Sequence, residues 1–174
     1  MLYVLAFCRI VIGVVFLVSF LRKISNVPIF EQTITQFSIL PKRFSRVVAL
    51  LFLSCEIAVA LLVIIGGPFL VPGFLLSILL LLVFSSALMS VLHRNIQTSC
   101  SCFGSIQKQV SPIDVWRNVG FVVCALLGYV ALAESSSGQG YLDLAEWSLI
   151  GLVAVAFVVI WVQLGEIVLL FRQN

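Results

Sequence analysis

The sequence has few charged residues. Only 10% of its 174 residues are Asp, Glu, Lys or Arg, whereas a soluble domain usually carries about 25%. Apolar residues make up 62% of the chain, and its mean hydropathy is +1.24. These values exclude a water-soluble globular fold and indicate a protein whose solvent is lipid.

Basic residues and cysteines are also too few for two other classes of protein. The formal net charge of +3 comes from scattered residues, whereas a nucleic-acid-binding surface needs a clustered basic face. We therefore expect no nucleic-acid partner. The five cysteines are about 3% of the chain, a share far below that of a small secreted disulfide scaffold, so any thiol chemistry depends on their positions.

Long apolar runs predict membrane-spanning helices. About 20 apolar residues, at a rise of 1.5 Å per residue, cross the hydrocarbon core of a bilayer. The runs do not alternate apolar with polar residues, as the strands of a membrane barrel do. The first run lacks the pattern of a signal peptide, so we expect it to be retained. The sequence thus predicts an all-α integral membrane bundle, a single domain over residues 1–174 with spans at about 2–21, 47–65, 69–92, 112–133 and 147–170.

A short amphipathic helix is predicted after the first span. Phe30, Ile34 and Phe37 follow the i, i+4, i+7 spacing of one helical face, which favours a helix lying along the membrane surface. Pro41 is expected to end it. An ordinary loop with a few apolar residues is the alternative.

Basic residues in the connections predict the orientation of the chain. Nine of the ten Lys and Arg residues fall on one face of the predicted bundle. The positive-inside rule then places the N-terminus outside and the C-terminus in the cytoplasm. The nine are Arg22, Lys23, Lys42, Arg43, Arg46, Arg94, Lys108, Arg117 and Arg172.

Two ionisable residues, Arg9 and Glu56, lie within predicted spans. An ionised group at mid-membrane costs at least about 2.5 kcal/mol, so each needs a partner or a function. Counted from Arg22 and Arg46, they lie roughly 20 Å and 15 Å deep at 1.5 Å per residue. We therefore expect a bidentate ion pair between neighbouring antiparallel helices. Such a pair either fixes the helix register or serves a polar ligand or a proton pathway.

Cys100 and Cys102 differ from the other cysteines because they lie in a polar connection, within the run SCSCFG at 99–104. A disulfide across one intervening residue closes a small, strained ring, which favours reversible exchange over permanent bracing. Two alternatives are open. One is a metal site that recruits His93, although a fourth ligand is missing; the other is a pair of thiols without chemistry.

The remaining cysteines, Cys8, Cys55 and Cys124, fall inside predicted spans. A lone cysteine there usually acts as a small apolar filler. Cys55 and Cys124 are also candidate accessory thiols, which would pass electrons from the polar connection toward the far face.

Residues in the first four predicted spans and their connections, together with the Cys-x-Cys-Phe-Gly run at 100–104, match the pattern of a known family. These residues are Arg9, Gly13, Phe16, Ser19, Lys23, Leu40, Pro41, Glu56, Ser111, Arg117 and Asn118. Over about residues 1–132 the chain resembles the MauE family of methylamine-utilisation membrane proteins, relatives of the DoxX group.

The resemblance implies a four-helix core, to which the span at 147–170 is an addition. It also implies a helper of the bacterial cytoplasmic membrane that matures an exported, disulfide-rich enzyme, methylamine dehydrogenase. Cys100 and Cys102 would then be the catalytic pair of a thiol-disulfide oxidoreductase, and Lys23 an accessory residue. The partners would be a thioredoxin-like protein and the exported substrate. A membrane quinone is a candidate electron acceptor, although no quinone motif is readable.

The role implied by the family and the count of basic residues place Cys100 and Cys102 on opposite sides of the membrane. Export requires Cys100 and Cys102 outside the cytoplasm, whereas the basic residues place them inside. An electron relay from cytosolic thiols would satisfy both. Two further functions are open: a non-catalytic assembly factor or subunit of a larger membrane complex, and a small transporter that uses Arg9 and Glu56. The transporter is disfavoured because no broken helix is visible in the sequence.

Overall fold

The computed structural model describes residues 1–36, 42–93, 112–135 and 143–172. Within these ranges the chain forms helices and no strands. The elements are α1 (Leu2–Ile24), α2 (Val27–Gln36), α3 (Lys42–Ile65), the 3-10 turn η1 (Gly67–Phe69), α4 (Leu70–His93), α5 (Pro112–Ser135) and α6 (Leu144–Arg172). The predicted all-α architecture is confirmed.

Among the described residues, five helices are long and apolar enough to cross a membrane, as predicted. They cover Leu2–Ile24, Phe44–Ile65, Gly67–His93, Pro112–Glu134 and Leu144–Gln163. The second of these long helices, α3, begins at Lys42, five residues before the predicted span at 47–65. The reason is that hydropathy detects only the apolar part of a helix, while the backbone hydrogen bonds continue through its basic first turn.

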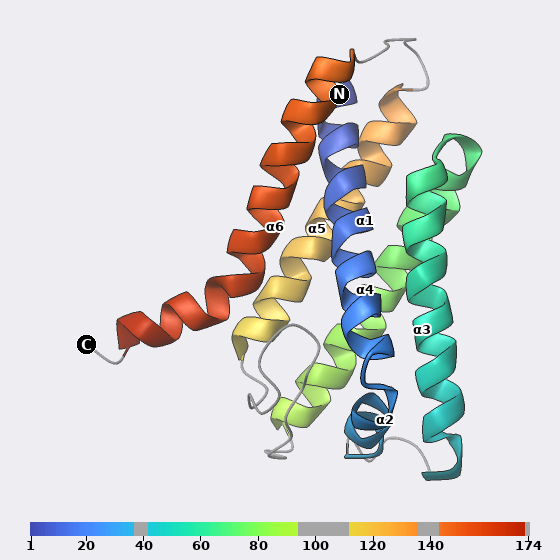
Figure 1. Cartoon of the computed structure of the whole chain (residues 1–174), viewed down its shortest axis with the longest axis vertical. Coiled ribbons are helices and arrows are strands. Elements are labelled where there is room, and N and C mark those ends of the chain that lie inside the picture. Colours follow the sequence, from blue (N-terminus) through green and yellow to red (C-terminus); the bar gives the residue numbers. More distant parts are fainter. Residues whose placement is uncertain (37–41, 94–111, 136–142, 173–174) are drawn as a thin grey trace.

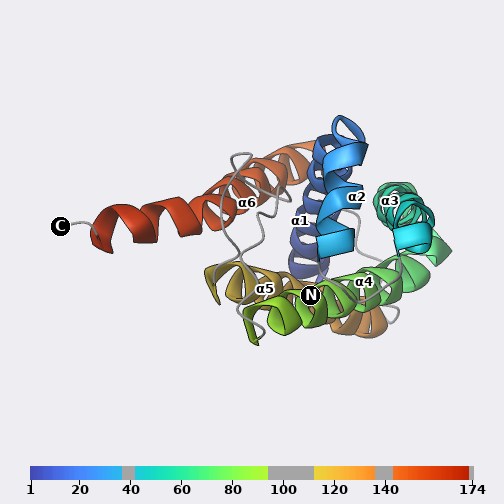
Figure 2. The same cartoon turned by 90° about the horizontal axis from the view of Figure 1, so that it is seen from below.

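Consecutive long helices run in opposite directions (Figure 1). The central helix is α1, which packs against α3, α5 and α6, while α4 packs against α3 and α5. Accordingly, 44% of the most apolar window of α1 is buried, but only 17% of that of α6. The last turns of α6 point away from the bundle (Figures 1 and 2).

One apolar core joins the five long helices. Large side chains from α1, α4 and α5 pack within it, whereas α3 and α6 add only alanine and valine. The buried residues are Cys8, Val11, Ile12, Val15, Phe16, Val59, Ala60, Val63, Leu70, Phe74, Leu80, Leu81, Phe121, Cys124, Ala125, Ala154 and Val158.

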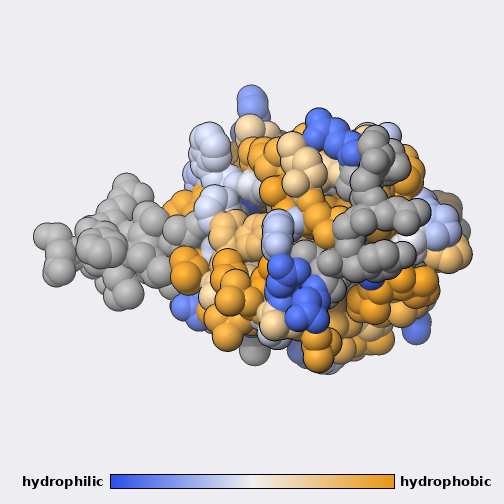
Figure 3. Space-filling view, turned by 90° about the horizontal axis from the view of Figure 1, so that it is seen from above, coloured by the Kyte–Doolittle hydropathy of each residue, from blue (hydrophilic) through white to orange (hydrophobic). Residues whose placement is uncertain are grey.

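Apolar side chains also cover the outside of the bundle. Leu51, Leu79 and Leu127 are each more than half exposed, and Figure 3 shows apolar side chains around much of the perimeter of the end that carries the N-terminus. Such a surface is unfavourable in water and suits contact with lipid tails.

The short helix predicted after the first span is confirmed as α2. It lies across the end of the bundle (Figure 2), and Phe30 packs against Ala49 and Leu53 of α3. Phe37 and Pro41 lie outside the described residues. The apolar face of α2 is therefore used, at least through Phe30, to cover α3.

Candidate functional site

A lysine–glutamate ion pair is buried near the end of the bundle that holds α2. Lys23 Nζ donates a hydrogen bond to Glu56 Oε1, and Ser19 Oγ donates to the same oxygen at 3.0 Å. The Lys23 and Glu56 side chains are each only 4% exposed. Ser19 and Lys23 stand one turn apart on the same face of α1, so this helix presents both donors to the carboxylate on α3.

Three aromatic rings surround the Lys23 ammonium. Nζ lies 5.0 Å from the ring centroid of Phe30, 4.7 Å from that of Phe52 and 5.4 Å from that of Phe84. The rings come from α2, α3 and α4. A cation over an aromatic face is attracted by the ring quadrupole, more strongly when it is desolvated. The rings therefore stabilise the ammonium on the sides that the carboxylate does not occupy.

A small cavity adjoins the ion pair. Its volume is about 20 Å³, which is room for one water molecule. Lys23, Glu56, Ser19 and Asn118 supply its polar lining. The second carboxylate oxygen, Glu56 Oε2, accepts no hydrogen bond from the described part of the chain. The pocket thus presents a buried acceptor where a water or another small polar group fits.

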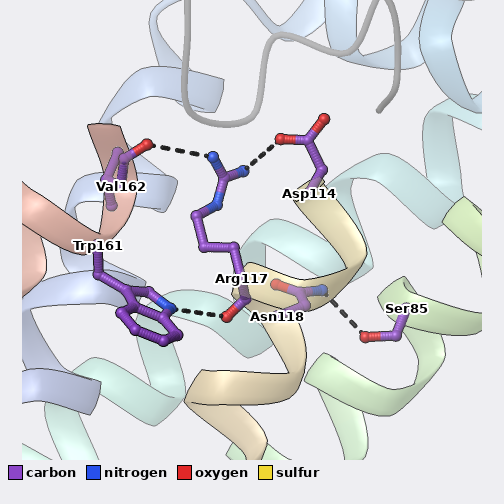
Figure 4. Close-up of polar contacts among 6 residues, drawn as sticks. All are labelled: Ser85, Asp114, Arg117, Asn118, Trp161 and Val162. Carbon is purple, nitrogen blue, oxygen red and sulfur yellow. Dashed lines mark hydrogen bonds and ion pairs between the residues drawn. The ribbon is translucent and has the colours of Figure 1, made fainter. Parts of the chain in front are cut away.

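Polar contacts at the start of α5 tie it to its neighbours (Figure 4). Asn118 Nδ2 donates to Ser85 Oγ on α4 at 3.2 Å. Arg117 forms an ion pair with Asp114 at 3.2 Å, and its Nη1 donates to the carbonyl of Val162 on α6 at 3.4 Å. These contacts fix the first turns of α5 and hold Asn118 beside the cavity.

α6 is also joined to α5 through Trp161. Its indole Nε1 donates to the carbonyl of Arg117 at 3.2 Å. Gly120 makes the approach possible, because a Cβ at this position would lie 2.4 Å from the indole ring.

The expected ion pair between Arg9 and Glu56 is wrong. Glu56 is paired with Lys23, and Arg9 is bound elsewhere. Arg22 and Arg46 do not lie at the same level, because Arg22 is three residues past Ser19 on α1 whereas Arg46 is ten residues before Glu56 on α3. Ser19, not Arg9, is level with Glu56, so Arg9 is about ten residues, roughly 15 Å at 1.5 Å per residue, too far along α1.

Arg9 instead closes the opposite end of α3. Its Nε and Nη2 donate to the carbonyls of Val63 and Ile64, both at 2.7 Å. Cations at a helix C-terminus satisfy free carbonyls and suit the helix dipole. The guanidinium also lies 5.6 Å from the ring centroid of Trp147 on α6. Arg9 therefore has a structural role that links three helices.

The turn after α3 is shaped for this guanidinium. Gly66 has φ +78° and Gly67 has φ +60°, values that favour glycine. A Cβ on Gly66 would lie 2.5 Å from Arg9 Nη2, whereas nothing lies within 4 Å of one on Gly67.

The cysteines fall into three groups. Cys100 and Cys102 lie outside the described residues. Cys55 is half-buried on α3, next to Glu56 in sequence. Cys8 on α1 and Cys124 on α5, both free thiols, lie close together in one buried apolar cluster, which the sequence pattern did not reveal.

The sequence identified Glu56 and Lys23 as candidates, but it did not pair them. The i, i+4 spacing of Ser19 and Lys23 was the available signal, because it places both on one face opposite a carboxylate in another span. The aromatic rings had no signal, since phenylalanine is common throughout the chain, with 14 in total.

The arrangement defines a class: a multi-pass helical membrane protein with a buried ion pair near one end of its bundle. The family model described as "Methylamine utilisation protein MauE" matches residues 1–131. The chain is 38% identical over 137 residues to "Methylamine utilization protein MauE" of Paracoccus denitrificans, covering 76% of this chain and 73% of the relative. No solved structure matches.

The chain therefore belongs to the MauE family. The match ends within α5, so α6 lies outside the family model.

Proposed function

We propose that this protein is an accessory factor of methylamine utilisation in the bacterial cytoplasmic membrane, and that it matures an exported redox protein by thiol-disulfide exchange. The observation that carries the proposal is membership of the MauE family together with the Cys-Ser-Cys-Phe-Gly run at 100–104. Two thiols separated by one residue close a strained disulfide, which suits a bond that is made and broken in each cycle.

The described geometry supports a working site at this end of the bundle. The connection that contains Cys100 and Cys102 leaves α4 at His93 and enters α5 at Pro112, and both points lie at the end that holds α2 (Figure 1). The ion pair and the polar contacts of Arg117 lie toward the same end. This part of the scaffold therefore holds the anchors of the connection in fixed positions.

The proposed exchange conserves electrons and protons. A thiolate of the substrate attacks the Cys100–Cys102 disulfide and forms a mixed disulfide. The second substrate thiol then displaces the remaining sulfur, so the substrate gains a disulfide and the two cysteines become thiols. A thioredoxin-like protein would carry the disulfide between this chain and the exported substrate. Reoxidation transfers two electrons and two protons to a membrane quinone.

The test is the double variant Cys100→Ser/Cys102→Ser, with Ser99→Ala/Ser101→Ala, at the other two positions of the Ser-Cys-Ser-Cys stretch, as the matched control. Each is expressed in a methylamine-growing bacterium that lacks its own family member, and membrane abundance is measured beside growth on methylamine. We expect the double variant to lose growth at normal abundance and the control to keep it. Growth of the double variant would overturn the exchange and favour a non-catalytic assembly factor or accessory subunit.

Sidedness is tested by a membrane-impermeant maleimide on intact cells. Substrate oxidation outside the cytoplasm requires labelling of reduced Cys100 and Cys102 from outside. The positive-inside count predicts the opposite. Protection in intact cells, with labelling after the membranes are opened, would rule out direct exchange with an exported partner. It would favour a relay from cytosolic thiols instead.

A further inference from the structure

Two buried thiols from different helices meet in the core of the bundle. Cys8 on α1 is 2% exposed and Cys124 on α5 is 7% exposed, both belong to the same buried cluster, and the two thiols are close enough for each to influence the other. Both belong to the apolar core and neither contributes to the Lys23–Glu56 site.

α1 and α5 approach each other closely at this level. Gly128 stands one turn beyond Cys124 on the same face of α5. A Cβ on Gly128 would lie 3.0 Å from Cys8 Cβ and 2.6 Å from a ring atom of Phe74. Small residues let membrane helices come close, and a disulfide requires the two Cα atoms to be within about 7 Å. The close approach therefore favours a bond between the two sulfurs.

We propose that Cys8 and Cys124 form a two-electron redox site inside the membrane, oxidised by a lipid-soluble quinone. Two S–H bonds break and one S–S bond forms between α1 and α5. The two electrons reduce the conjugated ring of the quinone and the two protons bind its two carbonyl oxygens, which gives a quinol.

The position of the thiols selects this class of oxidant. Cys8 is six residues and Cys124 eleven residues from the nearer end of its helix, which is at least roughly 9 Å at 1.5 Å per residue. The surroundings are apolar side chains such as Val11 and Phe121. A hydrophilic disulfide such as oxidised glutathione does not partition to this depth, whereas a hydrophobic quinone does.

The experiment uses the full chain carrying Cys100→Ser/Cys102→Ser in lipid vesicles, so its result does not depend on the proposed function. The chain is reduced, freed of reductant and exposed to decyl-ubiquinone or to oxidised glutathione. It is then denatured in the presence of N-ethylmaleimide and digested for mass spectrometry. Cys55, half-buried and next to Glu56 in sequence, is the internal control thiol.

With the quinone we expect a disulfide-linked pair of peptides containing Cys8 and Cys124, one quinol formed per link, and alkylated Cys55. Oxidised glutathione should give no link, and Cys8→Ser or Cys124→Ser should abolish it and leave the other thiol alkylated. Full alkylation of both thiols after quinone treatment would overturn the proposal. So would linkage of either thiol to Cys55, or closure by glutathione as fast as by quinone.

Discussion

The buried pair of Lys23 and Glu56 gives the sharpest test of the structure. Both side chains are 4% exposed, so removal of one partner leaves a buried charge with too few contacts. Loss of one member of a buried ion pair usually lowers the free energy of unfolding by about 3 to 5 kcal/mol. We expect a loss in this range for Lys23→Met, because the unpaired carboxylate on α3 is short and cannot reach the boundary.

Glu56→Leu should cost less than Lys23→Met. The ammonium keeps its contacts with the rings of Phe30, Phe52 and Phe84, and its long stem can turn toward the nearby end of α1. We expect a loss of about 2 to 3 kcal/mol. The double variant should regain most of the stability, because apolar replacement of a whole buried pair is often neutral.

The assay is reversible unfolding in mixed micelles, driven by added dodecyl sulfate and followed by the loss of helical circular dichroism. The four chains form a double-mutant cycle, in which we expect a coupling of at least about 2 kcal/mol. Arg22→Met is the matched control, since Arg22 is adjacent to Lys23 and exposed. Two single losses below about 1 kcal/mol that simply add would refute a buried, coupled pair.

Two pairs of glycines supply further tests in the same assay. Gly66→Ala and Gly67→Ala should each lower the free energy of unfolding by about 1 kcal/mol, because both positions have a positive φ. Only the Cβ added at Gly66 meets the Arg9 guanidinium, so we expect Gly66→Ala to cost about 1 to 3 kcal/mol more than Gly67→Ala. Equal losses would contradict the role of Arg9 at the end of α3. Gly120→Ala should lower stability by about 1 to 3 kcal/mol because its Cβ meets Trp161. A Cβ at Gly151 meets nothing within 4 Å, so Gly151→Ala should leave the stability unchanged or raise it by up to about 1 kcal/mol. A Gly120→Ala variant as stable as Gly151→Ala would be evidence against the close contact between Gly120 and Trp161.

Much of the fold was predictable because membrane insertion is a local property of the sequence. A run such as 69–92 contains enough apolar residues to span a bilayer whatever surrounds it. The short helix after the first span was likewise visible in its spacing. The register between helices could not be predicted from the sequence, because it depends on packing between α1 and α3 and on how far each helix extends past its apolar run.

The residues of the candidate site were likewise predictable only in part. Glu56 was identified because a carboxylate in a span is costly by itself. Its partner was misassigned because Lys23 is the last but one residue of α1, a position typical of a solvated boundary residue. Proximity between distant segments, such as that of Cys8 to Cys124, leaves no periodic trace in the sequence and becomes visible only when the helices are placed together.

The distance in sequence between Lys23 and Glu56, 33 residues, has a consequence for biogenesis. When α1 leaves the ribosome and enters the bilayer, its carboxylate partner has not yet been inserted. Until then the ammonium stays among the headgroups, since long basic side chains reach out to the interface. The ammonium can therefore be buried against its carboxylate only once α3 has been inserted beside α1.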